Sequence, residues 1–232
     1  MYIMEYTHNL KNDQFMNEFI FKNKKNGYFV EIGACTGIRS SQCYAFEKYL
    51  EWNGIAVEPQ KYFHKELIKN RKNVSFNAIS DANSTVEFTE IQNKNMCSGI
   101  TKKINDLEDK RKFKIQKFRK NEIKYTVESV TLKTLLDKYN SPLTIDWIAI
   151  DAEGCELCIL SKFFEENNNK YKVMAFSLET NKTDFVKMDE ILKKNDYVEV
   201  FNPLIKNMRY RGQIVDWEKY YVHCDLKSTI DL

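Results

Sequence analysis

Three carboxylates at the ends of apolar runs could perform acid–base chemistry: Asp151, Glu153 and Glu179. Asp151 follows the most apolar run of the chain, residues 144–150, and Glu179 closes another, residues 173–179. Short apolar runs of this kind are typical of buried strands. Carboxylates held close together raise one another's pKa, which suits a base that takes a proton from a hydroxyl group. We therefore expect Asp151 to be the first candidate general base, with Glu153 and Glu179 next.

A glycine-containing stretch near the N-terminus is the candidate ligand loop. The apolar run 28–32 contains Glu31 and is followed by Gly33-Ala34 and, four residues after the first glycine, by Gly37. Ser41 then leads into a helix-like segment that it could cap. A strand, a glycine turn and a helix N-terminus together favour a polar or negatively charged ligand, because backbone N–H groups and the helix dipole point toward it. The spacing does not meet the G-x-G-x-x-G dinucleotide fingerprint.

Further polar residues follow the next two predicted strands. Glu58 ends the run 54–57, about twenty residues after the last glycine of the loop, where nucleotide-binding α/β folds place an acid that accepts hydrogen bonds from ribose hydroxyls. Pro59 then fixes the turn. Ile79 and Ser80 end the predicted strand 73–79, at the position where this fold usually holds adenine.

The order of elements predicts one Rossmann-like α/β domain. Strands and helices alternate from residue 28 to 200, which indicates a mostly parallel, seven-stranded sheet with helices on both faces. Ligands bind such sheets at the C-terminal ends of the strands. We expect an N-terminal helix within residues 1–27 and the main domain over 28–232. The last two strands, 197–201 and 217–224, are expected to pair as an antiparallel hairpin at the sheet edge.

The composition of the chain bears on the cellular compartment in which we expect the protein. No apolar run approaches the ~18 residues of a membrane span, and the first residues lack the apolar core of a signal peptide. Six cysteines are scattered along the chain, which favours a reduced, cytoplasmic compartment with free thiols. Cys155 and Cys158 form a C-x-x-C pair, but no histidine stands at a spacing that would complete a zinc site. We interpret this pair as ordinary helix thiols.

Positive charge is concentrated in one insertion, residues about 92–122. Residues 101–124 contain ten Lys or Arg against four acids, a net charge of +6, whereas the whole chain carries +3. We expect a helical or mobile cover with a solvated face. A clamp for an acidic substrate or for nucleic acid is the alternative.

The sequence resembles the FkbM-type methyltransferases, which depend on S-adenosylmethionine (SAM). The most specific match is the block from Asp151 to Glu156, Asp-Ala-Glu-Gly-Cys-Glu, and the other matching segments are 29–38, 44–59, 77–80, 97–100 and 145–150. The resemblance implies a class I methyltransferase fold and transfer of a methyl group from SAM to a hydroxyl of a sugar, a glycan or a glycosylated small molecule. No membrane or nucleic-acid partner is expected.

The expected SAM-binding residues are those that follow the predicted strands: Glu31, Gly33, Ala34, Gly37, Ser41, Glu58, Pro59, Ile79, Ser80 and Asp151. Asp151 could act as the base or could hold the amino group of SAM, and the two roles stay open here. Glu156, one turn into the following helix, is expected to be a structural partner of the loop.

Three other interpretations remain. Asp151, Glu179 and Asn181 could hold a Mg²⁺ that binds the substrate oxygens, although a metal is not favoured. Asp151 and Lys182, with a lysine of the N-terminal helix and Glu199, loosely resemble the Lys-Asp-Lys-Glu set of RNA ribose 2′-O-methyltransferases. A catalytically silent nucleotide-binding module would bind SAM without turnover.

Overall fold

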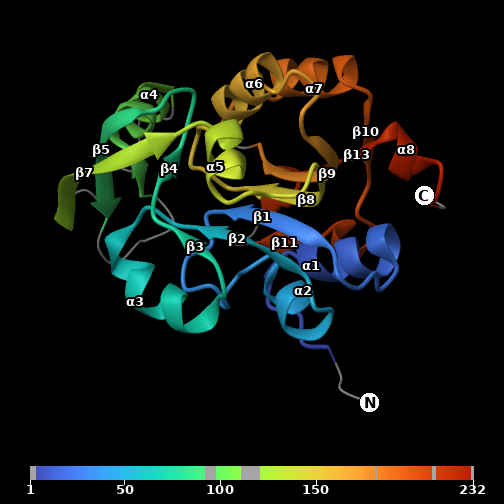
Figure 1. The fold of residues 1–232 in the computed structure, drawn as a ribbon. Helices are drawn as coiled ribbons and strands as arrows, with labels where there is room; N and C mark the ends of the chain where they lie inside the picture. The colour runs from blue at the N-terminus through green and yellow to red at the C-terminus, as the bar shows by residue number, and fades with distance from the viewer. Residues whose placement is uncertain (1–3, 92–97, 111–120, 181, 211–212, 231–232) are drawn as a thin grey trace.

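The structure, a computed structural model, describes residues 4–91, 98–110, 121–180, 182–210 and 213–230. A seven-stranded sheet forms its centre (Figure 1). Its strands, in spatial order, are β10 (Tyr197–Val200), β13 (Glu218–His223), β9 (Lys172–Glu179), β8 (Thr144–Ile150), β1 (Tyr28–Ile32), β2 (Asn53–Val57) and β3 (Val74–Ser75). Neighbouring strands from β9 to β3 run parallel. The predicted α/β fold with a mostly parallel seven-stranded sheet is therefore confirmed.

Strand β13 is the antiparallel member of this sheet. It lies between β9 and β10 and runs antiparallel to both. The expected antiparallel pairing of the last two strands is thus present, and it closes the edge of the main sheet. The register places Glu218, at the start of β13, opposite Glu179, at the end of β9.

Helices cover both faces of the sheet, because successive strand residues point to opposite sides. One face packs against α5 (Leu132–Lys138), α6 (Glu156–Glu166) and α7 (Phe185–Lys194) through Val30, Ile148 and Phe176. The other face presents Phe29, Trp147 and Ala175 to the N-terminal segment and to α2 (Tyr44–Tyr49). On that side α3 (Lys61–Asn70) packs Leu67 against Ala34 and Ala56.

The N-terminal segment differs from the single helix predicted within residues 1–27. It forms one α-turn, α1 (Asn12–Phe15), followed by a π-helix, η1 (Met16–Phe21). Its buried face includes apolar side chains and also the fully buried polar side chains of Asn12, Asp13 and Asn17. A simple apolar stripe could not indicate this broad face, because polar residues are normally assigned to the solvent side. The segment packs on the main core.

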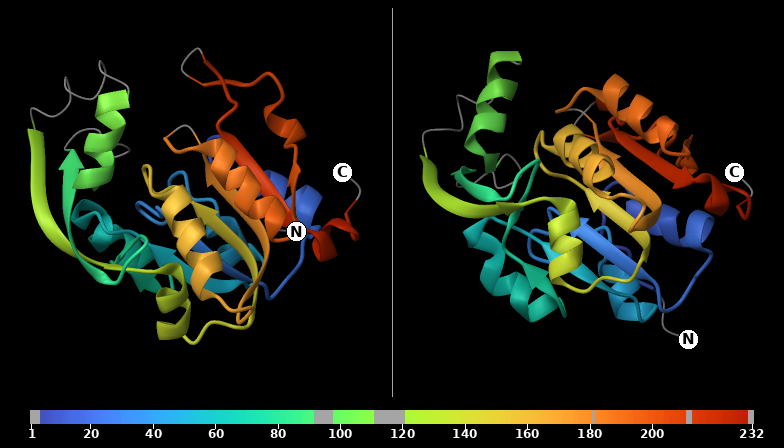
Figure 2. Two further views of the ribbon diagram at one scale, coloured as in Figure 1. Left: turned by 90° about the horizontal axis from the view of Figure 1, so that it is seen from above. Right: turned by 45° about the horizontal axis from the view of Figure 1, so that its top comes forward.

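A second sheet extends from the predicted third strand. Instead of one strand over 73–79, β3 ends at Ser75 and β4 (Ala78–Ile79) pairs in the second sheet, since the chain leaves the main sheet around Asn77. The second sheet has the order β4, β7 (Glu122–Val130), β5 (Ser84–Ile91) and β6 (Gly99–Ile100). Figure 2 shows it beside helix α4 (Thr101–Lys110), away from α7.

The predicted basic insertion is therefore partly helical. Strand β6 lies in its first described part, helix α4 follows, and β7 begins at its end, while residues 92–97 and 111–120 lie outside the described residues. The remaining short elements are the 3₁₀ turn Pro203–Ile205, the hairpin of β11 (Arg209–Tyr210) with β12 (Gln213–Ile214), and α8 (Cys224–Lys227). In the described part of the chain no helix is both long and apolar enough to cross a membrane.

Candidate active site

The loop after β1 packs directly on the end of the central strand β8. Gly33 has a φ of +90°, and a Cβ atom at this position would lie 2.3 Å from the carbonyl oxygen of Asp151. Gly37 has a φ of +82°, and its Cβ would lie 2.6 Å from Cγ of Arg71. Glycine is needed at both positions because any other residue would be strained and would clash. The backbone N–H groups of Gly33 and Ala34 both donate to the carbonyl oxygen of Val57, 3.0 Å away.

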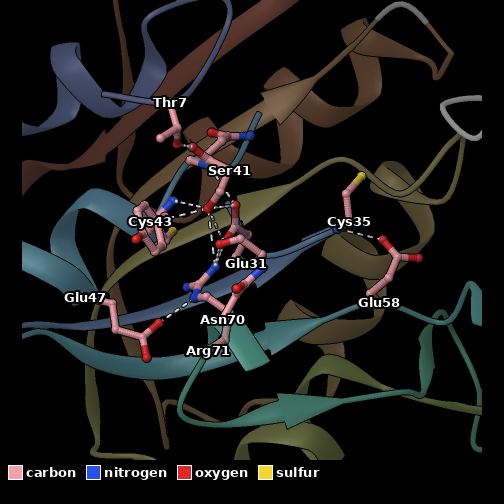
Figure 3. Close-up of polar contacts among 12 residues, drawn as sticks. Thr7, Glu31, Cys35, Ser41, Cys43, Glu47, Glu58, Asn70 and Arg71 are labelled. Carbon is pink, nitrogen blue, oxygen red and sulfur yellow. Dashed lines mark hydrogen bonds and ion pairs between the residues drawn. The ribbon is translucent and has the colours of Figure 1, made fainter. Parts of the chain in front are cut away.

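Glu31 lies in a buried polar network that holds the far end of this loop (Figure 3). Its carboxylate accepts hydrogen bonds from the Ser41 hydroxyl at 2.8 and 2.9 Å and from the Gln42 backbone N–H at 2.6 Å. Nη1 of Arg71 forms an ion pair with it at 2.6 Å, and Nε of Arg71 pairs with Glu47 on α2. Ser41 also accepts from the backbone N–H of Tyr44 at 2.9 Å, but the N-cap residue of α2 is Cys43, so the predicted helix cap is wrong in position. Arg71 was not predicted, since its partners are 24 and 40 residues distant in sequence.

Glu58 follows β2 and faces the same loop (Figure 3). Its two carboxylate oxygens accept from the backbone N–H groups of Cys35 and Gln60, each at 2.9 Å. Burial raises the pKa of Glu58 to about 7, although these two hydrogen bonds oppose the rise. A carboxylate offers about four acceptor positions, so two remain for further donors.

The expected adenine-binding residues lie between the two sheets. Ile79 is buried in the core of the main sheet, and the backbone N–H of Ser80 donates to the carbonyl oxygen of Val130 at 3.1 Å. The Ser80 hydroxyl is 2.5 Å from that of Ser129. Pro59, directly after Glu58, leads into α3. Ile79 and Ser80 are thus held by β7 of the second sheet, whereas Pro59 follows Glu58 in the chain.

The candidate bases form an acidic cluster around one lysine. Nζ of Lys182 lies 2.5 Å from Glu153 and 2.9 Å from Glu179. Asp151 is partly exposed as a residue, but its Oδ1 atom is buried and has no hydrogen-bond partner among the described residues. Glu153 adopts a left-handed φ of 52°, a conformation that is uncommon outside glycine and marks a constrained turn. Lys182 was expected only as part of the RNA-type set.

The electrostatic environment of this cluster raises the pKa values of Asp151 and Glu153, which favours their protonated forms. Burial, with the Glu179 and Glu153 carboxylates, raises the pKa of Asp151 well above its usual range, and Lys182 opposes this rise. Burial raises the pKa of Glu153 to about 8, again against the effect of Lys182. Burial lowers the pKa of the Lys182 ammonium, but Glu153 and Glu179 outweigh it and the pKa rises. A carboxylate with a raised pKa is a stronger base once it is ionised.

Glu156 supports the turn that carries Asp151 and Glu153. Its carboxylate accepts from the backbone N–H of Ala152 at 2.9 Å and from that of Gly154 at 3.1 and 3.2 Å. Burial raises its pKa to about 7. These contacts give Glu156 the structural role that the sequence suggested.

One arrangement resembles a metal site. A carboxylate oxygen from each of Asp151, Glu156 and Glu179 lies within 4.8 Å of the others. Glu156 replaces Asn181 of the predicted set, and Asn181 lies outside the described residues. The Lys182 ammonium already provides a positive charge at Glu179.

The N-terminal segment reaches the same end of the sheet, which the sequence did not indicate. Nδ2 of Asn12 donates to Glu218 at 2.8 Å and to Oε1 of Gln42 at 3.2 Å, and the Tyr220 hydroxyl donates to Oδ1 of Asn12 at 2.6 Å. Burial and the nearby Glu179 raise the pKa of Glu218 to about 8. Asn12 therefore joins the ligand loop to β13.

Two residues of the RNA-type set, Asp151 and Lys182, lie in one cluster, but Glu199 does not join them. Glu199 lies on the edge strand β10 and pairs with Lys219 at 3.1 Å, whereas Lys182 pairs with Glu153 and Glu179.

Comparison with known sequences gives a family match. The sequence model of the Methyltransferase FkbM domain matches residues 31–199, which is most of the chain. A search of curated proteins found no match.

Solved structures of similar fold include three methyltransferases. Methyltransferase FkbM from Methylobacillus flagellatus KT is 11% identical, with a TM-score of 0.49, and the alignment covers 87% of this chain and 44% of that one. Precorrin-6y C5,15-methyltransferase from Geobacter metallireducens GS-15 is 12% identical, with a TM-score of 0.40 and coverages of 91% and 85%. The hMettl16 catalytic domain in complex with the MAT2A 3′UTR hairpin 6 is 10% identical, with a TM-score of 0.42 and coverages of 95% and 72%. The chain spans less than half the length of the first of these structures.

Proposed function

Since the chain belongs to the FkbM family of SAM-dependent methyltransferases, we propose that it transfers the methyl group of SAM to a hydroxyl oxygen of a sugar or glycan acceptor. SAM supplies an electrophilic methyl group on a positively charged sulfur. The protein then has to bring an oxygen nucleophile into line with that methyl and to take the proton of the hydroxyl group.

The proposed cofactor contacts follow the ends of the strands. Gly33 and Gly37 let the loop backbone approach the ligand closely, and Glu58 retains acceptor capacity for the ribose hydroxyls. Ile79 and Ser80 are the proposed contacts for adenine. Glu31 acts from behind the loop, through Ser41 and Arg71, as a positioning residue.

The buried, unpartnered Oδ1 atom of Asp151 is the observation that carries the proposal. A buried carboxylate oxygen without a donor is costly, so a ligand group that donates a hydrogen bond would be favoured there. Glu153 and Glu179 are held by Lys182, which leaves Asp151 as the acceptor best placed for the hydroxyl proton.

The same carboxylates bear on the choice of acceptor. The cluster contains three carboxyl groups, from Asp151, Glu153 and Glu179, but one ammonium group, from Lys182. Glu218 of β13 also lies opposite Glu179 of β9. Carboxyl groups form hydrogen bonds with neutral hydroxyl groups whether they are ionised or protonated, and Lys182, the cation beside them, is already paired with Glu153 and Glu179. This arrangement supports a neutral polyhydroxyl acceptor over RNA.

Substitution of Asp151 tests the base role. We expect Asp151→Asn to bind S-adenosylhomocysteine with nearly unchanged affinity and to lose roughly 10²- to 10⁴-fold in turnover, the usual contribution of a general base. Titration calorimetry gives the affinity, and release of S-adenosylhomocysteine from SAM with a panel of neutral and acidic sugars gives turnover.

Asp196→Asn, at an exposed carboxylate in the turn between α7 and β10, is the matched control and should change neither quantity. A large loss of S-adenosylhomocysteine affinity in Asp151→Asn would instead assign Asp151 to the amino group of the cofactor. Methylation of RNA but of no sugar would contradict the proposed acceptor, and binding without turnover on any acceptor would indicate a silent module.

A metal-assisted reaction is the second candidate, because three carboxylate oxygens lie within 4.8 Å of one another. It predicts that a chelator abolishes turnover and that Mg²⁺ restores it. Turnover that is indifferent to a chelator would exclude this candidate.

A further inference from the structure

Two cysteines lie at the start of α6, directly after the turn that carries Asp151 and Glu153. Cys155 is the N-cap residue with helical backbone angles, φ −95° and ψ −3°, and Cys158 stands three residues further on. Residues at this separation in a helical turn have Cα atoms ~5 Å apart, from the rise and radius of the α-helix. Disulfides span roughly 4.4–6.8 Å between Cα atoms, so the backbone already has a suitable separation.

The Cys158 side chain is also directed back toward Cys155. Sγ of Cys158 lies 3.1 Å from the carbonyl oxygen of Cys155, to which its thiol donates a hydrogen bond. Each thiol is close enough to the other to shift its pKa. A disulfide could therefore form with little movement of the backbone.

The two thiols differ in exposure and in electrostatic environment. Cys155 is 1% exposed, whereas Cys158 is partly exposed. The hydrogen bond with Cys155 lowers the pKa of Cys158, and Lys103 of α4 lowers it further, although burial opposes both. The hydrogen bond with Cys158 and burial raise the pKa of Cys155. A partly exposed thiolate beside a lysine is the reactive form of cysteine, and a buried neutral thiol is not.

We propose that Cys155 and Cys158 form a redox-active dithiol that a peroxide converts into an intramolecular disulfide. The Cys158 thiolate attacks one peroxide oxygen, the O–O bond breaks, and a sulfenic acid and water result. The Cys155 sulfur then attacks the sulfenic sulfur and expels a second water. The two thiols lose two electrons and two protons, and the peroxide is reduced to two water molecules. The proposal does not depend on methyl transfer.

The disulfide would form within the framework of the candidate active site. The backbone N–H of Cys155 donates to the carbonyl oxygen of Ala152 at 3.3 Å, and Glu156 lies between the two cysteines. A Cβ atom at Gly99, just before α4, would lie 3.2 Å from Cβ of Glu153. The dithiol therefore adjoins the turn that carries Asp151 and Glu153, and this turn lies against Gly99 of β6.

Peptide mapping of the full chain tests the proposal directly. Trypsin releases residues 139–162 as one peptide, whose two cysteines are Cys155 and Cys158. In reduced protein we expect this peptide to accept two alkyl groups from iodoacetamide. After hydrogen peroxide it should accept none and have lost two hydrogen atoms, and dithiothreitol should restore both sites. A peptide that still accepts two alkyl groups, or that gains oxygen irreversibly, would overturn the proposal.

Substitutions in α4 separate a thiolate-stabilising role of Lys103 from simple packing. Lys103→Met should slow alkylation of Cys158 several-fold at pH 7 and move the pH–rate profile to higher pH, because the ammonium that favours the thiolate is gone. Lys102→Met, an exposed neighbour on the same helix, is the matched control. The exposed Cys224 serves as an internal reference whose rate should not change. Equal rates for Lys103→Met and the unsubstituted protein would contradict the assigned order of attack.

Discussion

Glu58 is a residue whose ionisation should control cofactor affinity. Burial raises its pKa to about 7, so the carboxyl is mostly protonated below pH 7 and mostly ionised above it. Ribose hydroxyls donate to the ionised form more strongly, since hydrogen bonds to charged groups are worth about 1.5–3 kcal/mol. We therefore expect S-adenosylhomocysteine to bind more tightly as the pH rises from 6 to 8, with proton release on binding below pH 7. Calorimetry in buffers of different ionisation enthalpy measures both effects.

Glu58→Gln keeps the shape of the side chain and removes its titration. This variant should bind more weakly at pH 8 and should lack the pH dependence that belongs to Glu58. Glu218→Gln is the comparison variant, because it removes a different buried carboxyl group, whose pKa is raised to about 8. A pH effect that both variants remove would not belong to the ribose contact alone. The same pH slope in the unsubstituted protein and in Glu58→Gln would show that another group controls binding.

The candidate residues that the sequence revealed share one property: they stand at the ends of apolar runs. Glu58, Asp151 and Glu179 could be found because parallel strands bring their C-terminal ends to one edge of a sheet. Arg71 and Lys182 could not be recognised in this way, because their roles depend on partners that come near them only in the folded protein. In the sequence Arg71 directly follows a helix and Lys182 stands between a strand and a helix, and charged residues at such places are usually solvated.

At the scale of elements, Arg71 joins α3 to the loop after β1 and to α2. Its side chain is fully buried between Glu31 and Glu47. Removal of one partner from a buried ion pair leaves uncompensated charge, which costs about 3–5 kcal/mol. We expect Arg71→Met to lower the free energy of unfolding by about this amount and to weaken S-adenosylhomocysteine binding.

Urea unfolding followed by circular dichroism measures the stability of this variant. Arg39→Met, in the same loop but exposed, should stay within about 0.5 kcal/mol of the unsubstituted protein. Glu31→Gln in the Arg71→Met background should recover part of the loss, because it neutralises the stranded carboxylate. No loss in Arg71→Met would mean that the network contributes little.

Asn12 plays a comparable role for the N-terminal segment. Its fully buried amide links Gln42 of the ligand loop to Glu218 and Tyr220 of β13. Asn12→Ala leaves these polar groups without partners, at a cost of about 1–3 kcal/mol for each group that stays buried. It should lower both the unfolding free energy and the affinity for S-adenosylhomocysteine.

Glu18→Ala, exposed in the neighbouring π-helix, is the control for a general effect on the segment. Unchanged affinity in Asn12→Ala would separate the N-terminal segment from the site.

Elements were predictable where hydrophobic periodicity matched a single buried face. This holds for the strands β1, β2, β8 and β9, whose apolar runs lie in the centre of a covered sheet. The winding of η1 was not predictable, because its buried face includes Asn17 as well as apolar residues. The break between β3 and β4 was missed for another reason: one apolar run serves two sheets.

At the scale of the whole molecule, the second sheet shares its core with the main sheet. Ile79 belongs to the core of the main sheet, and Ile100 and Val130 pack against it. Ile100 also contacts the small cluster of Ala78, Phe88 and Val127 inside the second sheet. The backbone N–H of Lys61, on α3, donates to the Tyr125 hydroxyl of β7 at 3.0 Å. These contacts indicate one cooperative unit with a single unfolding transition.

Phe88 tests this cooperativity, because it is 3% exposed and lies in the core of the second sheet. Phe88→Ala should cost about 3–5 kcal/mol through the cavity it leaves. In one cooperative unit the whole transition would then move down by roughly 10 °C, and saturating S-adenosylhomocysteine would move it back up as one. Thr126→Ala, exposed on the paired strand β7, should leave the midpoint unchanged. Differential scanning calorimetry distinguishes this outcome from two separate transitions, of which Phe88→Ala would move one alone.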